Sequence, residues 1–421
     1  MDHTLNFLLD DCSITELMPD NAWKANAQNR INNTRKAPIT LNLSGPADSD
    51  GYYLELIQEK RSFAWGTAVR MSHITDNFTA YQNFLYKNFE WAVPSNAMKW
   101  RLMERAKVRT YTKVITSILL KVRGHNMFWA TDQHCPAWLF GMSHDQVLAE
   151  MKRHVNSMIS HTKGKLQHWD VNNENLHGDF YERHTGNPDI TNDMFSWIHT
   201  LEPGVKLFLN DFNVVTSPDD TTAIKNEALR MKSAGVPLYG IGVQAHFKSG
   251  IINIDSVKYR LDKVAEAGLP IWITEFTVTE ADDTKQASAL EDLLTLFYSH
   301  PAVEGILIWG FWDGAIFDPK AAITTGPQVT LRAAGHSYEK LVNNDWKTHL
   351  RRQITSKQPI HTKVFTGDYL LVTRHQGKVI HQQRFSVGKG GKTLTVHLQG
   401  MLFKERYIVQ SLFPDFYDLQ L

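Results

Sequence analysis

The sequence reads KLFLNDFNVV at residues 206–215 and YGIGVQAHF at 239–247, followed by PIWITEF (270–276) and GILIWGF (305–311). Each run is apolar and has the length of a strand, while intervening segments such as 289–300 place apolar residues at helical spacing. Apolar strands that alternate with amphipathic helices indicate a parallel sheet covered by helices.

Four earlier runs extend this pattern, namely FAWGTAV (63–69), FEWAV (89–93), VRGHNMFW (122–129) and HWDVNNE (168–174). Eight strands of this kind favour an α/β fold closed into a (β/α)8 TIM barrel over an open doubly wound sheet. No G-x-G-x-x-G motif follows the first run, which argues against a dinucleotide-binding domain. We therefore expect the barrel to occupy residues 62–355.

The flanking segments have strand-like patterns of their own. Residues 37–43 and 52–58 are expected to form a β-hairpin after an irregular leader, so residues 1–61 are predicted to be an N-terminal extension. Residues 367–387 and 392–398 alternate between polar and apolar positions, which predicts a small β-rich appendage over residues 356–421.

Composition limits the classes of function. The chain of 421 residues has a formal net charge of +1, which provides no strong field for binding nucleic acid or an anionic membrane. No apolar stretch approaches the length of about 18 residues that a transmembrane helix needs. The histidines show no H-x-H or H-E-x-x-H spacing, so we expect no metal and no other cofactor.

Cysteines and glycosylation sequons bear on the compartment. Cys12 and Cys135 could form one disulfide, and the sequence does not decide whether they pair. Sequons at Asn32, Asn42 and Asn77 agree with secretion, although the first residues show no export signal. We expect a secreted monomer.

Two glutamates stand at the ends of predicted strands, where barrel enzymes carry their active sites. Glu174 ends the run 168–174, and Glu275 lies near the end of the run 270–276. Two carboxylates across one barrel mouth suit glycoside hydrolysis, because one protonates the leaving oxygen while the other attacks the anomeric carbon. A single strand-end glutamate is more often a solvated or ion-paired residue, so the prediction depends on its neighbours.

These neighbours resemble glycoside hydrolase family 10, the endo-β-1,4-xylanase family, and its plant and animal members in particular. WDVNNE (169–174) is similar to the family's W-D-V-V-N-E, and ITEF (273–276) to its I-T-E-L-D. Four more motifs occur in family order, namely VRGHNMFW (122–129), LNDFN (209–213), GIGVQAH (240–246) and IWG (308–310). The resemblance covers roughly residues 25–400.

The resemblance implies a retaining endo-hydrolase that cleaves a β-1,4-linked polysaccharide, most readily xylan, through a covalent glycosyl-enzyme. It assigns Glu174 as the acid/base and Glu275 as the nucleophile. Asn173 would bond the sugar 2-hydroxyl, and His246 and Gln244 would lie beside the nucleophile.

The resemblance also implies substrate contacts. On the non-reducing side, hydroxyl groups would be bound by Asn96, Lys99 and His125. The aromatic floor and walls of the cleft would be formed by Trp129, Trp309 and Trp312.

Four residues depart from the family pattern. Ser95 replaces a glutamate, Ala130 a second histidine, Phe212 a tyrosine, and Thr277 the aspartate that orients the histidine beside the nucleophile. Thr277 is therefore expected to leave the tautomer of that histidine less determined. These departures keep two alternatives open: a hydrolase of a different β-glycan, or a weak or inactive glycan-binding protein on the same barrel.

Overall fold

A computed structural model describes residues 16–45, 51–75, 78–103, 118–248, 250 and 252–398. The chain divides into two compact units. The barrel unit comprises Met1–Arg35 and Phe63–Trp346, and the β unit comprises Lys36–Ser62 and Lys347–Leu421.

The barrel unit contains the predicted eight parallel strands. They are β3 (Ala64–Val69), β4 (Trp91–Pro94), β5 (Lys121–Gly124), β7 (His168–Asn173), β8 (Lys206–Asp211), β9 (Gly240–Val243), β11 (Ile271–Thr279) and β12 (Val303–Ile308). Each pairs with the next, and β12 pairs in parallel with β3 to close the ring. The (β/α)8 prediction is confirmed.

Two of the predicted runs are each divided into two short strands. The run 122–129 contains β5 and β6 (Phe128–Trp129), and the run 239–247 contains β9 and β10 (His246–Lys248). β6 pairs with β7, and β10 pairs with β11, so both extend the barrel wall at the carboxyl ends of the strands. This arrangement places Trp129 and His246 at the rim.

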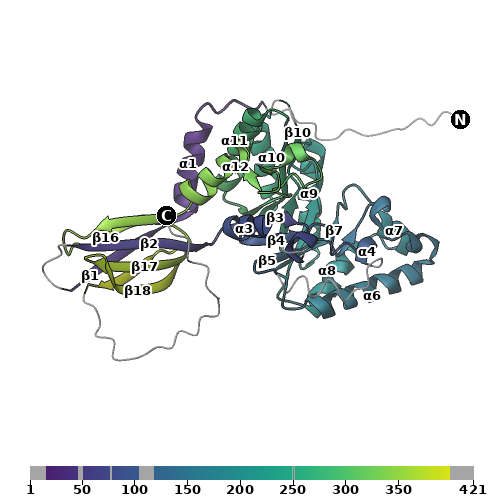
Figure 1. The fold of residues 1–421 in the computed structure, drawn as a ribbon. Helices are drawn as coiled ribbons and strands as arrows, with labels where there is room; N and C mark the ends of the chain where they lie inside the picture. Colours follow the sequence, from purple (N-terminus) through teal and green to yellow (C-terminus); the bar gives the residue numbers. More distant parts are fainter. Residues whose placement is uncertain are drawn as a thin grey trace. The chain divides into compact units, whose positions relative to one another are not determined.

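Helices surround the strands (Figure 1). Those between successive strands are α2 (Ser72–Thr75), α3 (Thr79–Asn88), α4 (Trp100–Met103), α6 (His144–Thr162), α7 (Phe180–Thr185), α8 (Ile190–Leu201), α9 (Pro218–Ser233), α10 (Ile254–Ala265) and α11 (Asp283–Ser299). After β12 come α12 (Ala333–Tyr338) and a π-helical turn (Glu339–Asp345). The N-terminus of α6 has a capping box formed by Ser143 and Gln146.

A helix that the sequence analysis did not predict begins near the end of the expected irregular leader, residues 1–25. α1 (Trp23–Thr34) buries Ala27 and Ile31. At its end, the Arg35 guanidinium donates to the carbonyl oxygens of Tyr298 and Val303, both at 2.8 Å. These contacts with the end of α11 and the start of β12 explain why the helix is ordered, and no local sequence pattern encodes them.

The β unit combines strands from both ends of the chain. One sheet has the order β16 (Ile360–Phe365), β1 (Lys36–Ser44), β19 (Lys392–His397), and the other β15 (His349–Gln353), β2 (Tyr52–Arg61), β17 (Gly367–His375), β18 (Lys378–Val387). Within the described residues, β1 and β2 do not pair with each other, so the predicted hairpin is wrong although both strands exist. The extensions over 1–61 and 356–421 were expected to be separate pieces, but strands β1 and β2 of the first share one hydrophobic core with strands of the second, which includes Leu41, Leu54 and Leu371.

Helix length bears on membrane insertion. Among the helices in the described ranges, none is both long and apolar enough to cross a bilayer.

Candidate active site

Glu174 directly follows β7, at the point where the chain turns into the next loop. Its backbone has a φ of 59°, and its N–H donates to the carbonyl oxygen of Asn210 (2.9 Å). Its carboxylate accepts two neutral donors, Trp129 Nε1 at 2.7 Å and Gln244 Nε2 at 3.1 Å. Gln244, expected beside Glu275, therefore binds the other glutamate.

The surroundings of Glu174 favour its protonated form. Burial is the largest cause of a raised pKa for this carboxyl, and the negative charges of Glu275 and Asp211 raise it further. Hydrogen bonds from Trp129 and Gln244 act in the opposite direction without reversing the shift. A carboxyl that keeps its proton in this way can act as a general acid.

Glu275 lies within β11 and is only 5% exposed. Its Oε1 accepts a hydrogen bond from Asn210 Nδ2 (3.0 Å), and its Oε2 lies 3.4 Å from His246 Nε2. Burial alone would raise the pKa of Glu275, but the hydrogen bond to His246 and the charges of His125 and Lys99 lower it overall. This carboxylate is therefore ionised and suited to attack carbon.

The two glutamates are connected through a buried amide pair. Asn210 Nδ2 donates to Asn173 Oδ1 (2.8 Å) as well as to Glu275, and Asn210 Oδ1 accepts from Thr274 Oγ1 (2.6 Å). In the described part of the chain, Nδ2 of Asn173 is buried and has no hydrogen-bond partner. Asn173 directly precedes Glu174, and its contact with a sugar hydroxyl stays a prediction.

Thr277 provides the partner for His246 that the sequence did not reveal. Its Oγ1 lies 2.9 Å from His246 Nδ1, and it is buried at the register position opposite that histidine. Because a hydroxyl can donate to Nδ1 or accept from Nδ1–H, this contact gives the imidazole a partner and an orientation, and the less determined tautomer stays a prediction.

Lys99 lies close to both carboxylates. Burial lowers the pKa of its ammonium, while the charges of Glu275 and Glu174 act to raise it. Its Nζ is 4.6 Å from the ring centre of Trp129 and donates to Asn96 Oδ1 (3.1 Å). Lys99 is therefore near both glutamates, and Asn96 is bonded to Lys99.

Ser95 points elsewhere. Its hydroxyl donates to the backbone carbonyl of Val69 (3.2 Å) and supplies no carboxylate to the cleft.

His125 is oriented by residues that the sequence analysis did not single out. Its Nδ1 lies 3.0 Å from Asp170 Oδ2, and Asp170 also binds the buried guanidinium of Arg123. Burial opposes ionisation of Asp170, but Arg123 and His125 lower its pKa overall. With Nδ1 occupied, His125 presents Nε2 to its surroundings, and its ring meets Trp309 edge-on at 5.1 Å.

The other predicted tryptophans have different surroundings. Trp129 stacks on His134 with a centroid distance of 3.6 Å, so part of its face is covered and its clearest role is donation to Glu174. Trp312 donates from Nε1 to the carbonyl of Gly326 (2.7 Å) and packs against Phe78. It therefore supports the loop after β12, and its place in the cleft wall stays a prediction.

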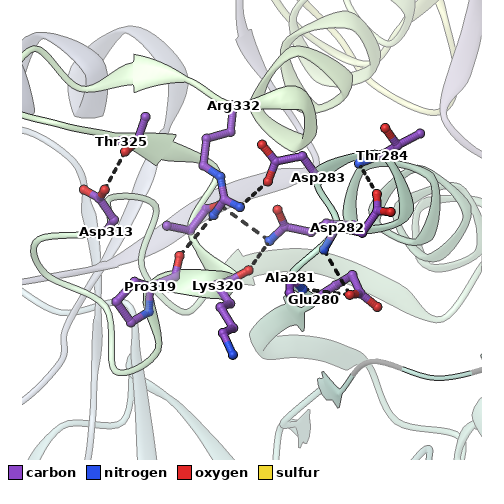
Figure 2. A network of polar contacts seen from close by, with 12 residues as sticks. Glu280, Ala281, Asp282, Asp283, Thr284, Asp313, Pro319, Lys320, Thr325 and Arg332 are labelled. Carbon is purple, nitrogen blue, oxygen red and sulfur yellow. Dashed lines mark hydrogen bonds and ion pairs between the residues drawn. The ribbon is translucent and has the colours of Figure 1, made fainter.

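Phe317 is a rim residue that sequence reasoning missed. It is 64% exposed, and its ring lies edge-on to His246 at 5.7 Å. Figure 2 shows how its loop is fixed, with Arg332 donating to the carbonyl of Pro319 (3.0 Å) and pairing with Asp283 at the start of α11. The only sequence signal is its position eight residues after Trp309.

The sequence predicts no metal site and leaves open whether Cys12 and Cys135 pair. Among the described residues, no group of three or more His, Cys, Asp or Glu side chains is arranged to bind a metal. Cys135 is buried with a free thiol, and Cys12 and Asn77 lie outside the described residues.

Comparison with known proteins agrees with this geometry. A model of glycosyl hydrolase family 10 matches residues 54–329. The anti-sigma-I factor RsgI6 of Acetivibrio thermocellus is 31% identical over 91% of this chain and 51% of its own length. Endo-1,4-beta-xylanase 1 of Arabidopsis thaliana is 30% identical over 87% of this chain and 40% of its own length. The chain thus spans about half or less of these relatives.

Solved structures show the same barrel. An intracellular xylanase of Thermoanaerobacterium saccharolyticum in complex with xylotetraose has 25% identity and a TM-score of 0.59, covering 66% of this chain and 95% of its own. Xylanase 10B of Thermotoga petrophila in complex with xylobiose shares the fold at 23% identity, with a TM-score of 0.59 over 68% of this chain and 95% of its own.

Proposed function

Because the chain belongs to glycosyl hydrolase family 10, we propose that it is a retaining endo-hydrolase of β-1,4-linked polysaccharide, with xylan as the first substrate to test. The observation that carries this proposal is that two neighbouring glutamates have surroundings that shift their pKa values in opposite directions. Burial and nearby carboxylates raise the pKa of Glu174, whereas His246, His125 and Lys99 outweigh burial and lower that of Glu275.

In the first step, ionised Glu275 attacks the anomeric carbon and forms an ester with it as the glycosidic C–O bond breaks. Glu174 gives its proton to the leaving oxygen, so that the departing sugar is neutral. Trp129 and Gln244 each bond one oxygen of Glu174 and stabilise its carboxylate form as the proton leaves. Asn173 Nδ2 donates to the 2-hydroxyl, an interaction that strengthens in the transition state.

In the second step, Glu174 takes a proton from water, whose oxygen attacks the anomeric carbon and releases Glu275. Esterification has by then removed the negative charge of Glu275, which was one cause of the raised pKa of Glu174. The pKa of Glu174 therefore falls between the steps, and the same group changes from acid to base.

Xylan is proposed because named relatives are endo-1,4-beta-xylanases and a similar solved structure holds xylotetraose. We also propose that the protein acts as a secreted monomer on this polymer, which agrees with the sequons at Asn32 and Asn42. Mass measurement of the protein purified from its natural host and its size in solution would test these points.

The alternative of an inactive glycan-binding protein was motivated by Ser95 and Thr277. The Thr277 argument for this alternative is weakened, because the Thr277 hydroxyl contacts His246 at the position where the family pattern has an aspartate. Ser95 does not replace the carboxylate of the glutamate that the family pattern has at this position. An altered substrate preference is therefore part of the proposal.

The deciding experiment measures release of reducing ends from xylan and other β-glycans, with the anomer of the first product followed by NMR. We expect β-anomer first, and a loss of at least ~10⁴-fold in Glu275→Ala, since the nucleophile is removed. Glu280→Gln, five residues further along the chain, is the matched control and should keep its activity. The proposal fails if no β-glycan is cleaved in a manner sensitive to Glu275→Ala.

A further inference from the structure

The backbone at Glu174 adopts a conformation that side chains disfavour. Its φ of 59° lies in the left-handed region, which a residue with a Cβ rarely adopts. The turn that follows is closed by His177 N–H donating to the carbonyl of Glu174 (3.1 Å). Such a turn persists only when surrounding contacts fix it.

Asp211, the last residue of β8, supplies these contacts. Its side chain is fully buried, and its Oδ2 accepts the N–H of Leu176 at 2.8 Å. Its Oδ1 accepts His177 Nδ1 at 2.7 Å and the N–H of Phe212 at 2.9 Å. Two of its three donors therefore belong to the turn that presents Glu174.

His177 connects this turn to the next loop. Its Nε2 lies 3.5 Å from Asp220 of α9, and its ring stacks on Phe212 with centroids 3.7 Å apart and planes 18° apart. Both ring nitrogens thus face carboxylates, and one face of the imidazole is covered. The side chain has one defined orientation although it is 25% exposed.

We infer that Asp211 and His177 are positioning residues for the acid/base: the buried carboxylate fixes the turn that presents Glu174, and the imidazole adjusts the charge beside it. The inference rests on the proposed function and extends it to two residues outside the expected site. Neither residue needs to contact the substrate for this role.

The charges around Glu174 give the pair a measurable signature. Glu174 is faced by Glu275 from β11, Asp211 from β8, Lys99 from the segment before α4, and His177 from its own loop. After burial, the charges of Glu275 and Asp211 raise the pKa of Glu174, so removing Asp211's charge should lower it.

His177 should act in the opposite direction. Its hydrogen bond to Asp211 is the largest cause of its raised pKa, and the charges of Asp220 and Glu174 contribute. Its proton therefore offsets part of Asp211's charge. Replacing His177 with a neutral residue should raise the pKa of Glu174.

The experiment compares Asp211→Asn and His177→Gln with Asp219→Asn, an exposed residue in the first turn of α9, as the matched control. Each is assayed on two aryl β-xylobiosides, one with a strongly acidic phenol as leaving group and one with a weakly acidic phenol. Only the second needs a proton from Glu174. We expect Asp211→Asn to lose about 100-fold in kcat/KM on the second substrate and less than fivefold on the first.

The pH profiles give a second readout. The basic limb of kcat/KM, which reports loss of the Glu174 proton, should move to lower pH in Asp211→Asn and to higher pH in His177→Gln. Asp219→Asn should stay within about twofold of the wild type. The inference would be overturned if Asp211→Asn lost the same activity on both substrates. It would also be overturned if the basic limbs of Asp211→Asn and His177→Gln moved in the same direction.

A spectroscopic measurement separates this inference from the proposed function. Imidazole NMR of the wild type should show His177 titrating above its ordinary pKa, with a fall in Asp211→Asn. An inactive wild type that shows this titration contradicts the function but not the Asp211–His177 contact. An active enzyme whose His177 titrates normally contradicts the contact alone. If Asp211→Asn does not fold, the inference is still tested by the pH profile of His177→Gln and by the imidazole titration of the wild type.

Discussion

Glu174 and Glu275 have the same side chain and lie close to one another, yet their surroundings differ in kind. Glu174 is bonded by neutral donors, Trp129 and Gln244, whereas Glu275 lies beside His246 and near the charge of Lys99. Burial acts on both in the same direction, so the positive groups decide the difference. The comparison teaches that the role of each carboxyl is set by its neighbours.

The largest expected effect comes from removing the titrating group of Glu174. Glu174→Gln should lower kcat on xylan by about 10³-fold, because general acid and base assistance are both lost. With an aryl substrate that needs no acid, the first step should remain fast and the glycosyl-enzyme should accumulate. Mass spectrometry of the digested protein should locate the sugar on Glu275, and a label elsewhere would contradict the assigned nucleophile.

A smaller effect is expected when Lys99 loses its charge. Its charge is one cause of the lowered pKa of Glu275, so Lys99→Met should raise that pKa. The acidic limb of kcat/KM, which reports ionisation of the nucleophile, should then move to higher pH, with about a tenfold rise in KM. Lys87→Met on α3 removes an exposed charge and should leave the profile unchanged. An unmoved acidic limb in Lys99→Met would show that the charge of Lys99 does not lower the pKa of Glu275.

Trp129→Phe tests the other side of the comparison. The indole N–H stabilises ionised Glu174, so its loss should raise the pKa of Glu174 and move the basic limb to higher pH. We expect a fall of about tenfold in kcat, as for the loss of one oriented hydrogen bond to a charged group. Trp138→Phe, an exposed tryptophan nearby in the chain, is the control, and a shift to lower pH in Trp129→Phe would contradict the assignment.

The smallest effect is expected at Thr277, which acts only through His246. Thr277→Val keeps the shape but removes the hydroxyl, and should lower kcat by about threefold to tenfold because one hydrogen bond orienting the imidazole is lost. Thr277→Ser should restore the activity. Equal activity in the valine and serine variants would show that the hydroxyl has no orienting role.

The flanking strands show where local patterns stop being informative. The alternation at 37–43 and 52–58 correctly predicts two strands, but alternation does not name a partner. β1 pairs in antiparallel register with β16 and in parallel with β19, both more than 300 residues away. Strands close in sequence often pair with each other. Here β1 and β2 instead pair with C-terminal strands, with which they share a hydrophobic core.

Local sequence patterns were enough to predict the (β/α)8 fold and to single out Glu174 and Glu275. Eight apolar runs alternate with helical segments, Glu174 directly follows one of those strands and Glu275 lies within another, so both predictions could be made from contiguous residues. Only the tertiary structure decided that Gln244 binds Glu174, that Thr277 contacts His246, and that Asp211 fixes the turn after β7. Hydrogen bonds join atoms across strands about 30 to 70 residues apart, and their geometry exists only after the barrel closes.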